Sequence, residues 1–164
     1  TGIGVVETRG QSLHYIHSEC VRVGAGPLGA RLVAIHQRIQ AVIGRFQPTS
    51  GAIEKVFVSA NPQSALVLGQ ARGSALLALA QSELEISEYS ALEIKRAITG
   101  TGRAGKEQVQ HMVRVLLGMD RKPAQDAADA LACAICHLHH AESRLRQTVA
   151  GVSVLAEDAG SARR

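Results

Sequence analysis

Two aspartates set three positions apart constrain this chain most, because they stand in AQDAADALACAICHLHH, residues 124–140, which is otherwise largely small and apolar. Residues i and i+3 are neighbours on a helix surface, so Asp126 and Asp129 would repel each other there. Pro123 favours a helix start, and the helix dipole stabilises a first-turn carboxylate by about 0.3–1 kcal/mol. The dipole explains why a carboxylate at Asp126 is tolerated, but its effect has faded by Asp129, nearly two turns into the helix. A bound cation, or a nearby lysine or arginine, explains the pair better.

The same stretch has two faces at helical spacing. The polar face consists of Asp126, Asp129, Cys133, His137 and His140. The opposite, apolar face consists of Ala128, Leu131, Ile135 and Leu138. The apolar face is expected to pack the helix against the protein. We expect the polar face to carry a metal or catalytic role, with a structural cap as the alternative.

Hydrophobic spacing elsewhere predicts one α/β domain with a mixed sheet. Three β-rich runs at residues 3–8, 12–16 and 20–23 predict a three-strand meander. Further along, apolar spacing and capping signals predict a helix over 27–46, a strand over 51–58, a helix over 61–81, a strand over 84–89, a short helix opened by Ser90 and Glu93, a helix around 109–117 and a last helix from 123. Strands alternating with helices are typical of a single α/β domain.

Composition limits the class of protein. The chain has 164 residues, 46% of them hydrophobic, which is enough for one buried core. Its 18 Lys+Arg against 14 Asp+Glu give a net charge of +4, which permits a polyanionic partner. The odd number of cysteines, and the lack of a signal peptide or a long apolar run, predict a reduced, soluble, cytoplasmic protein. We place the domain at residues 1–147 and expect a disordered basic tail over 148–164.

Glu54 interrupts the apolar run of the strand predicted over 51–58. A carboxylate in a central strand is costly unless it is paired or bound to a cation. A lysine partner or an edge position is the structural alternative. If Glu54 instead meets Asp126 and Asp129, their oxygens form the hard ligand set that Mg²⁺ or Mn²⁺ prefers. Two such ions can hold both the attacking water and the leaving oxygen of a phosphodiester.

A competing motif at residues 100–106 fits the GxxxxGK spacing of a phosphate-binding loop. Glu107 stands where such a loop has the Ser or Thr that holds Mg²⁺, and the preceding segment is predicted helical where a strand is needed. The sequence therefore disfavours a nucleoside triphosphatase.

A second competing motif places four zinc-type donors on one helical face, namely Cys133, Cys136, His137 and His140. A single straight helix rarely surrounds a zinc ion tetrahedrally, so a zinc site is disfavoured. The alternative is packed cysteines and solvated histidines near the end of the helix.

Four segments together resemble one family: AIEKVF, NPQSALVLGQARG, GKEQVQHMVRVLLG and DAADALACAICH. In order and without large gaps, they make residues 1–147 similar to the RuvC family of Holliday junction resolvases. The resemblance implies an RNase H-like mixed sheet flanked by helices and a homodimer. It also implies Mg²⁺-dependent paired nicking of opposed strands at four-way DNA junctions in recombination and repair. The implied partners are junction DNA and the branch-migration proteins RuvA and RuvB.

The resemblance also assigns site residues by matching motifs. Glu54, Asp126 and Asp129 take the places of three of the family's four metal-binding carboxylates. Lys95 and Lys106 match basic residues used near the scissile phosphate. Mg²⁺ is the implied cofactor, with Mn²⁺ as the alternative.

Two further expectations concern DNA contact and assembly. Phe57 matches an aromatic residue that contacts bases at the junction, and we expect it to be partly exposed. The helix over 62–80, in which Gly69 and Gly73 allow close approach, is the expected dimer interface.

This sequence departs from the family's pattern at its start. The pattern begins with a strand that ends in an aspartate, upstream of the stretch matched by Thr1. We therefore expect the first strand and the first carboxylate to be missing from this chain. Without that aspartate the chain is expected to be poorly stable and to bind junctions without cleaving them. Glu19 also replaces a glycine common in the family.

Overall fold

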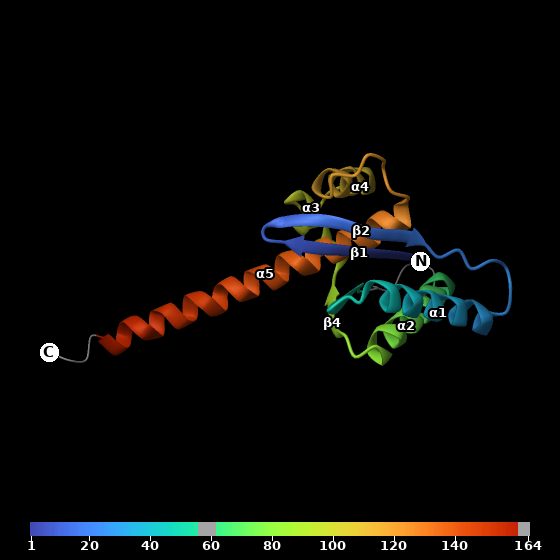
Figure 1. Cartoon of the computed structure of the whole chain (residues 1–164). Coiled ribbons are helices and arrows are strands. Elements are labelled where there is room, and N and C mark those ends of the chain that lie inside the picture. The colour runs from blue at the N-terminus through green and yellow to red at the C-terminus, as the bar shows by residue number, and fades with distance from the viewer. Residues whose placement is uncertain (56–61, 161–164) are drawn as a thin grey trace.

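The computed structural model describes residues 1–55 and 62–160, and the side chains of the last helix through residue 143. Figure 1 shows the elements in chain order: β1 (Gly2–Arg9), β2 (Ser12–Cys20), α1 (Leu28–Phe46), β3 (Ser50–Glu54), α2 (Pro62–Gln81), β4 (Glu85–Tyr89), α3 (Ala91–Thr99), α4 (Lys106–Leu116) and α5 (Gln125–Gly160). These elements confirm the predicted α/β class.

Strands β1 and β2 form an antiparallel hairpin that runs from the pair Gly2–Cys20 to the pair Arg9–Ser12. The third strand predicted over 20–23 is not formed. Its alternating Val21 and Val23 instead pack against the cluster around Ile35 from the loop that leads to α1. The alternating valines therefore pack against α1 from a loop and do not form a strand.

Strands β3 and β4 pair in parallel, from Ser50–Glu85 to Glu54–Tyr89. β3 ends at Glu54, and positions 56–58 of the strand predicted over 51–58 lie outside the described residues. Within the described part of the chain, the two strand pairs are not bonded to each other. A cavity of about 830 Å³, lined by residues of β1 and β3, lies between them. The predicted mixed sheet is thus present as two pairs.

Helices cover both faces of the strands. On β1, Gly2 and Gly4 face α5, whereas Ile3 packs toward α1 and α2. A Cβ at Gly4 would lie 2.8 Å from the Leu131 backbone nitrogen, so the close contact of β1 with α5 requires glycine there. The larger core joins α3, α4 and α5, and a smaller one joins α1 and α2.

Capping signals fix several helix ends as predicted. Ser90 Oγ accepts from the Glu93 backbone N–H at 3.3 Å, and Glu93 Oε2 accepts from the Ser90 N–H at 2.7 Å. This confirms the capping box of α3.

The last helix is longer than expected. α5 continues to Gly160, so the backbone is helical over 148–160, where the sequence analysis predicts a disordered tail. No proline follows Pro123, so nothing in this segment blocks helical hydrogen bonding. The domain boundary at residue 147 stays a prediction. No helix of the described ranges is long and apolar enough to cross a membrane.

Candidate active site

Two elements bring the three predicted carboxylates to one end of the strands. Glu54 is the last residue of β3, while Asp126 and Asp129 stand in the first turns of α5. All three line the cavity between β1 and β3. Strand ends next to helix starts are common sites of chemistry in α/β proteins.

Glu54 and Asp129 share one electrostatic environment. Protein atoms crowd the Glu54 carboxyl group although the residue keeps solvent-accessible surface, and this desolvation is the main cause that raises its pKa. The charge of Asp129 raises the Glu54 pKa further, whereas Lys95 and Lys106 lower it. Two carboxyls that disfavour each other's charge form a site that a cation would stabilise.

Asp129 responds to the same neighbours. Desolvation raises its pKa first, Lys106 and Lys95 lower it, and Asp126 raises it. Lys95 comes from α3, and Lys106 is the first residue of α4. The structure therefore brings both predicted lysines close enough to act on the carboxylates.

Asp126 has a different partner from Asp129. Its Oδ2 accepts from the amino group of Thr1 at 3.1 Å, and 57% of the Asp126 side chain is exposed. The β1 backbone lies directly against this part of α5, since a Cβ at Gly2 would fall 1.8 Å from the Asp126 carbonyl oxygen. Asp126 therefore lies where the start of β1 meets the first turn of α5.

The donor set can be tested against a magnesium ion. Oxygen donors of Glu54 and Asp129 fit the hard ligands that Mg²⁺ prefers, and their raised pKa values show an unmet need for positive charge. In their present positions, no three Asp, Glu, His or Cys side chains of the described residues are grouped to hold an ion. The residues therefore fit Mg²⁺ in chemistry, and the three carboxylates would have to come closer together to hold one ion.

Arg72 is a site residue that the sequence analysis missed. Its Nε donates to the Glu54 backbone carbonyl at 3.0 Å, and its guanidinium also pairs with Glu88 on β4. Arg72 thereby ties α2 to the end of β3 that carries Glu54. The available signal was that Arg72 is the one charged residue in the 20 residues of α2.

The middle of the polar face predicted for the last helix points into the protein, whereas Asp126, Asp129 and His140 are exposed. His137 is buried, with its Nε2 2.8 Å from Ser50 Oγ and its Nδ1 3.0 Å from Tyr89 Oη. The His140 ring stacks on Tyr89 at 5.1 Å. This face packs α5 against β3 and β4, so the prediction of a solvated surface for the histidines is wrong for His137.

The zinc alternative also loses support. Burial is the main cause that raises the pKa of Cys133 to about 12 and that of Cys136 to about 11. Zinc binds thiolates, and burial disfavours the thiolate form of both cysteines. His137 and His140 are engaged with Tyr89.

The phosphate-loop motif has the wrong context, as expected. α3 is a helix and ends at Thr99, where a phosphate-binding loop needs a strand, and Gly100 takes a left-handed conformation as its C-cap. Phe57, predicted to contact DNA bases, lies outside the described residues.

Comparisons with known proteins point to one family. The family model described as "Crossover junction endodeoxyribonuclease RuvC" matches residues 1–137. A protein of that name from Marinobacter nauticus is 50% identical over 154 residues, which cover 94% of this chain and 88% of that protein. One from Azoarcus sp. is 50% identical over 139 residues, 85% of this chain and 76% of that protein.

Two solved structures of Thermus thermophilus RuvC are also similar. One has a TM-score of 0.79 at 33% identity, covering 87% of this chain and 89% of the other. The second, in complex with a Holliday junction substrate, has a TM-score of 0.80 at 34% identity, covering 85% and 87%.

Proposed function

This chain belongs to the RuvC family of crossover junction endodeoxyribonucleases, and we propose that it resolves four-way DNA junctions by Mg²⁺-dependent paired nicking in recombination and repair. The observation that carries the proposal is the coupling of Glu54 with Asp129 beside two lysines. The similarity to a RuvC structure in complex with a Holliday junction substrate supports the same substrate.

Each side chain has a role that follows from its charge and place. Glu54, Asp129 and Asp126 would hold Mg²⁺, or Mn²⁺ in its place, and the bound metal would lower the pKa of a water and stabilise charge on the phosphodiester. Lys95 and Lys106 would attract and orient the scissile phosphate, because both act on these carboxylates. Arg72 would keep Glu54 in place through the backbone.

A homodimer is the proposed assembly, and α2 supplies the surface for it. Leu66, Leu68 and Leu77 on this helix are each more than half exposed, at 57%, 54% and 53%. A Cβ added at Gly69 or Gly73 would meet nothing within 4 Å, so another helix could approach there closely. RuvA and RuvB as partners, and a cytoplasmic location, follow from the family resemblance and belong to the same proposal.

Binding without cleavage is the second candidate. It is favoured by one observation: among the described residues, no three Asp, Glu, His or Cys side chains are grouped to hold a metal ion. Two carboxylates hold a metal ion more weakly than three or four. The positive groups would still bind the junction backbone.

A synthetic four-way junction separates the candidates. Each strand is end-labelled in turn, and cleavage is followed with Mg²⁺ and with a chelator, beside a linear duplex of the same sequence. Mg²⁺-dependent nicks on opposed strands of the junction alone support resolution. Preferential junction binding without nicks supports the second candidate, and equal binding of duplex and junction contradicts both.

A further inference from the structure

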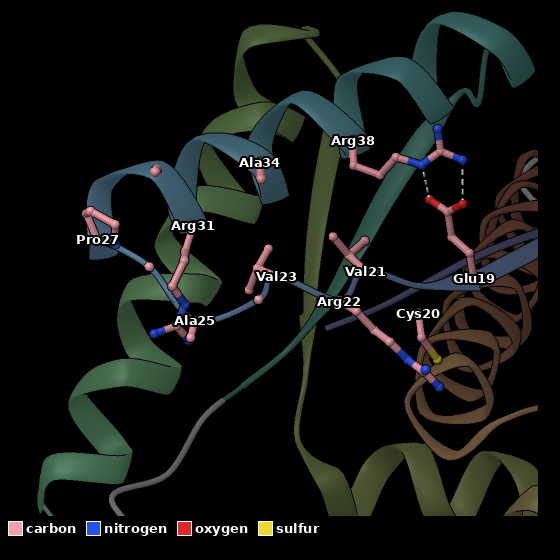
Figure 2. A pocket seen from close by; sticks show the side chains of 13 residues that line it. Glu19, Cys20, Val21, Arg22, Val23, Ala25, Pro27, Arg31, Ala34 and Arg38 are labelled. Carbon is pink, nitrogen blue, oxygen red and sulfur yellow. Dashed lines mark hydrogen bonds and ion pairs between the residues drawn. The ribbon is translucent and has the colours of Figure 1, made fainter.

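A second cavity, distinct from the carboxylate cavity, lies between the loop of residues 21–27 and the start of α1 (Figure 2). Its volume is about 650 Å³, and three of the residues that line it are arginines: Arg22, Arg31 and Arg38. Such a concentration of positive charge in one small region suits an anionic ligand.

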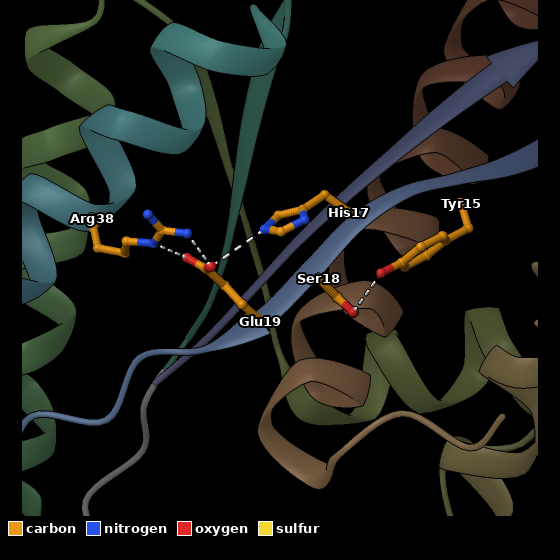
Figure 3. Close-up of polar contacts among 5 residues, drawn as sticks. All are labelled: Tyr15, His17, Ser18, Glu19 and Arg38. Atoms are coloured by element: carbon orange, nitrogen blue, oxygen red, sulfur yellow. Dashed lines mark hydrogen bonds and ion pairs between the residues drawn. The ribbon is translucent and has the colours of Figure 1, made fainter.

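One of the three arginines is already neutralised. Arg38 donates from Nε and Nη2 to the two carboxylate oxygens of Glu19, at 2.6 and 2.5 Å (Figures 2 and 3). This bidentate pair is the main cause that lowers the pKa of Glu19. Arg38 is therefore engaged within the protein and serves as an internal comparison for the other two.

Arg22 and Arg31 have no such partner among the described residues. Neither side chain makes an ion pair or a hydrogen bond within the described residues, and the Nε of Arg31 is buried without an acceptor. A buried donor left unsatisfied typically costs about 1–3 kcal/mol. A guanidinium presents its N–H groups in a planar fork that matches the oxygens of a phosphate.

The strand ladder places this loop at the same end of the molecule as the carboxylates. Cys20 pairs with Gly2, and the Val21 N–H donates to the Thr1 carbonyl at 2.8 Å. The Thr1 amino group in turn contacts Asp126 at 3.1 Å. Adjacent strands lie about 4.8 Å apart, so Val21 is one strand spacing from Thr1. Thr1 lies next to Asp126, and Arg22 is the residue after Val21.

We propose that Arg22 and Arg31 bind backbone phosphates of the DNA beside the strand held by the carboxylates. This inference rests on the proposed function, because it takes junction DNA as the ligand. Arg22 is exposed and its side chain points away from Arg31, whereas Arg31 extends from α1 toward the loop at Ala25 (Figure 2). The two side chains therefore make separate phosphate contacts along the loop, which extends the DNA-binding surface beyond Lys95 and Lys106.

The test measures junction affinity over a series of salt concentrations, with a chelator present so that no cleavage occurs. Each lost phosphate contact lowers the slope of log K against log salt by about 0.9. We expect R22Q and R31Q each to weaken binding several-fold with this change of slope, and R31K to restore the slope because the charge is kept. R9Q is the matched control, since it removes the same charge at the far end of the hairpin.

The outcomes separate this inference from the proposed function. If the unmodified chain prefers the junction but R22Q and R31Q behave like R9Q, the arginine sites are overturned while the proposed function stands. If the unmodified chain shows no preference for the junction, the proposed function fails, and the slopes on linear duplex still report whether the arginines contact phosphate. R22Q changes an exposed side chain and is expected to fold normally, which thermal unfolding checks.

Discussion

The two helical layers of this protein differ in how large a buried apolar core each forms against the strands. On the α5 side, twelve buried residues from β4, α3, α4, α5 and the loops beside them form one cluster, in which Leu131, Ile135 and Val113 have no measurable exposure. On the α1–α2 side, the buried cluster formed by the described residues consists of Ile35, Ile39 and Ala78. The same strands therefore have a thick core on one face and a thin one on the other.

Side-chain hydrogen bonds between α1 and α2 add to the small apolar core of this layer. Ser74 Oγ donates to the Leu32 carbonyl at 2.7 Å, and His36 Nε2 lies 2.7 Å from Gln81 Oε1. Leu66, Leu68 and Leu77 on α2 stay exposed, although a helix that is apolar all round is normally buried. The thick core thus packs the helix that carries Asp126 and Asp129, and the α1–α2 layer leaves apolar surface exposed, where we propose the dimer interface.

The largest effect is expected at the carboxylate end of the thick layer. D129N removes a metal oxygen donor and should reduce junction cleavage roughly a thousandfold, equivalent to about 4 kcal/mol of transition-state stabilisation. Junction binding and thermal stability should be kept, because Asp129 is exposed and its charge is opposed by Asp126. The control is D120N, an exposed aspartate just before α5, and equal losses in both variants would contradict the assigned role.

The difference between the layers can be tested with one type of substitution. L131A opens a cavity in the thick core and should lower the free energy of unfolding by about 2–5 kcal/mol. L77A makes the same change at a residue that is 53% exposed on α2, and should cost the monomer about 0.5 kcal/mol or less. Chemical denaturation of both variants gives the values, and similar losses would show that the two layers are equally packed.

Assembly is the next test of the thin layer. L66E places a charge on the exposed apolar face of α2 and should weaken a dimer by about tenfold or more, because burying an unpaired charge is costly. Sedimentation at several concentrations measures the change. The matched control is V115E on α4, a 51% exposed apolar residue of the other layer, which should leave the dimer intact. A dimer lost in V115E and kept in L66E would move the interface to the α5 side.

Sequence signals predicted local structure well and long-range partners poorly. The capping box at Ser90 and the helical spacing of α4 depend on neighbours within a few residues, and both were predicted. The tie from Arg72 to Glu88 joins residues 16 positions apart, and the pair Glu19–Arg38 joins residues 19 apart. Such pairs depend on how helices and strands pack together in three dimensions. Hydrophobic periodicity in the sequence does not predict that packing.

The candidate site shows the same limit. Glu54 was singled out because a charge in an apolar strand is costly by itself, and its coupling to Asp129 agrees with that argument. The lysines came from family resemblance rather than spacing, since α3 and α4 bring them to the site from separate helices. The predicted strand over 20–23 failed because Val21 and Val23 pack against α1 from a loop.

The smallest expected effect concerns the polar tie between β2 and α1, where Glu19 accepts from Arg38 and lies 3.4 Å from His17 Nε2 (Figure 3). The Arg38 hydrogen bonds hold the pKa of Glu19 below its ordinary value, so the folded state binds the proton more weakly than the unfolded state. The stabilisation is therefore present above the unfolded pKa of about 4.3 and is lost as pH falls through the folded pKa.

E19Q tests this tie by keeping the size of the side chain and removing its charge. At pH 7 the variant should unfold about 1–2 °C below the unmodified chain, a small shift because solvent screens a pair whose arginine is 49% exposed. The difference should shrink as pH falls below the ordinary glutamate pKa of about 4.3, should disappear once Glu19 is protonated in the folded state, and should shrink in high salt. E7Q, which breaks the exposed pair with Arg9 on the hairpin, is the control and should change nothing. A difference for E19Q that grows in acid would show that the α1 layer is not tied to β2 by this charge.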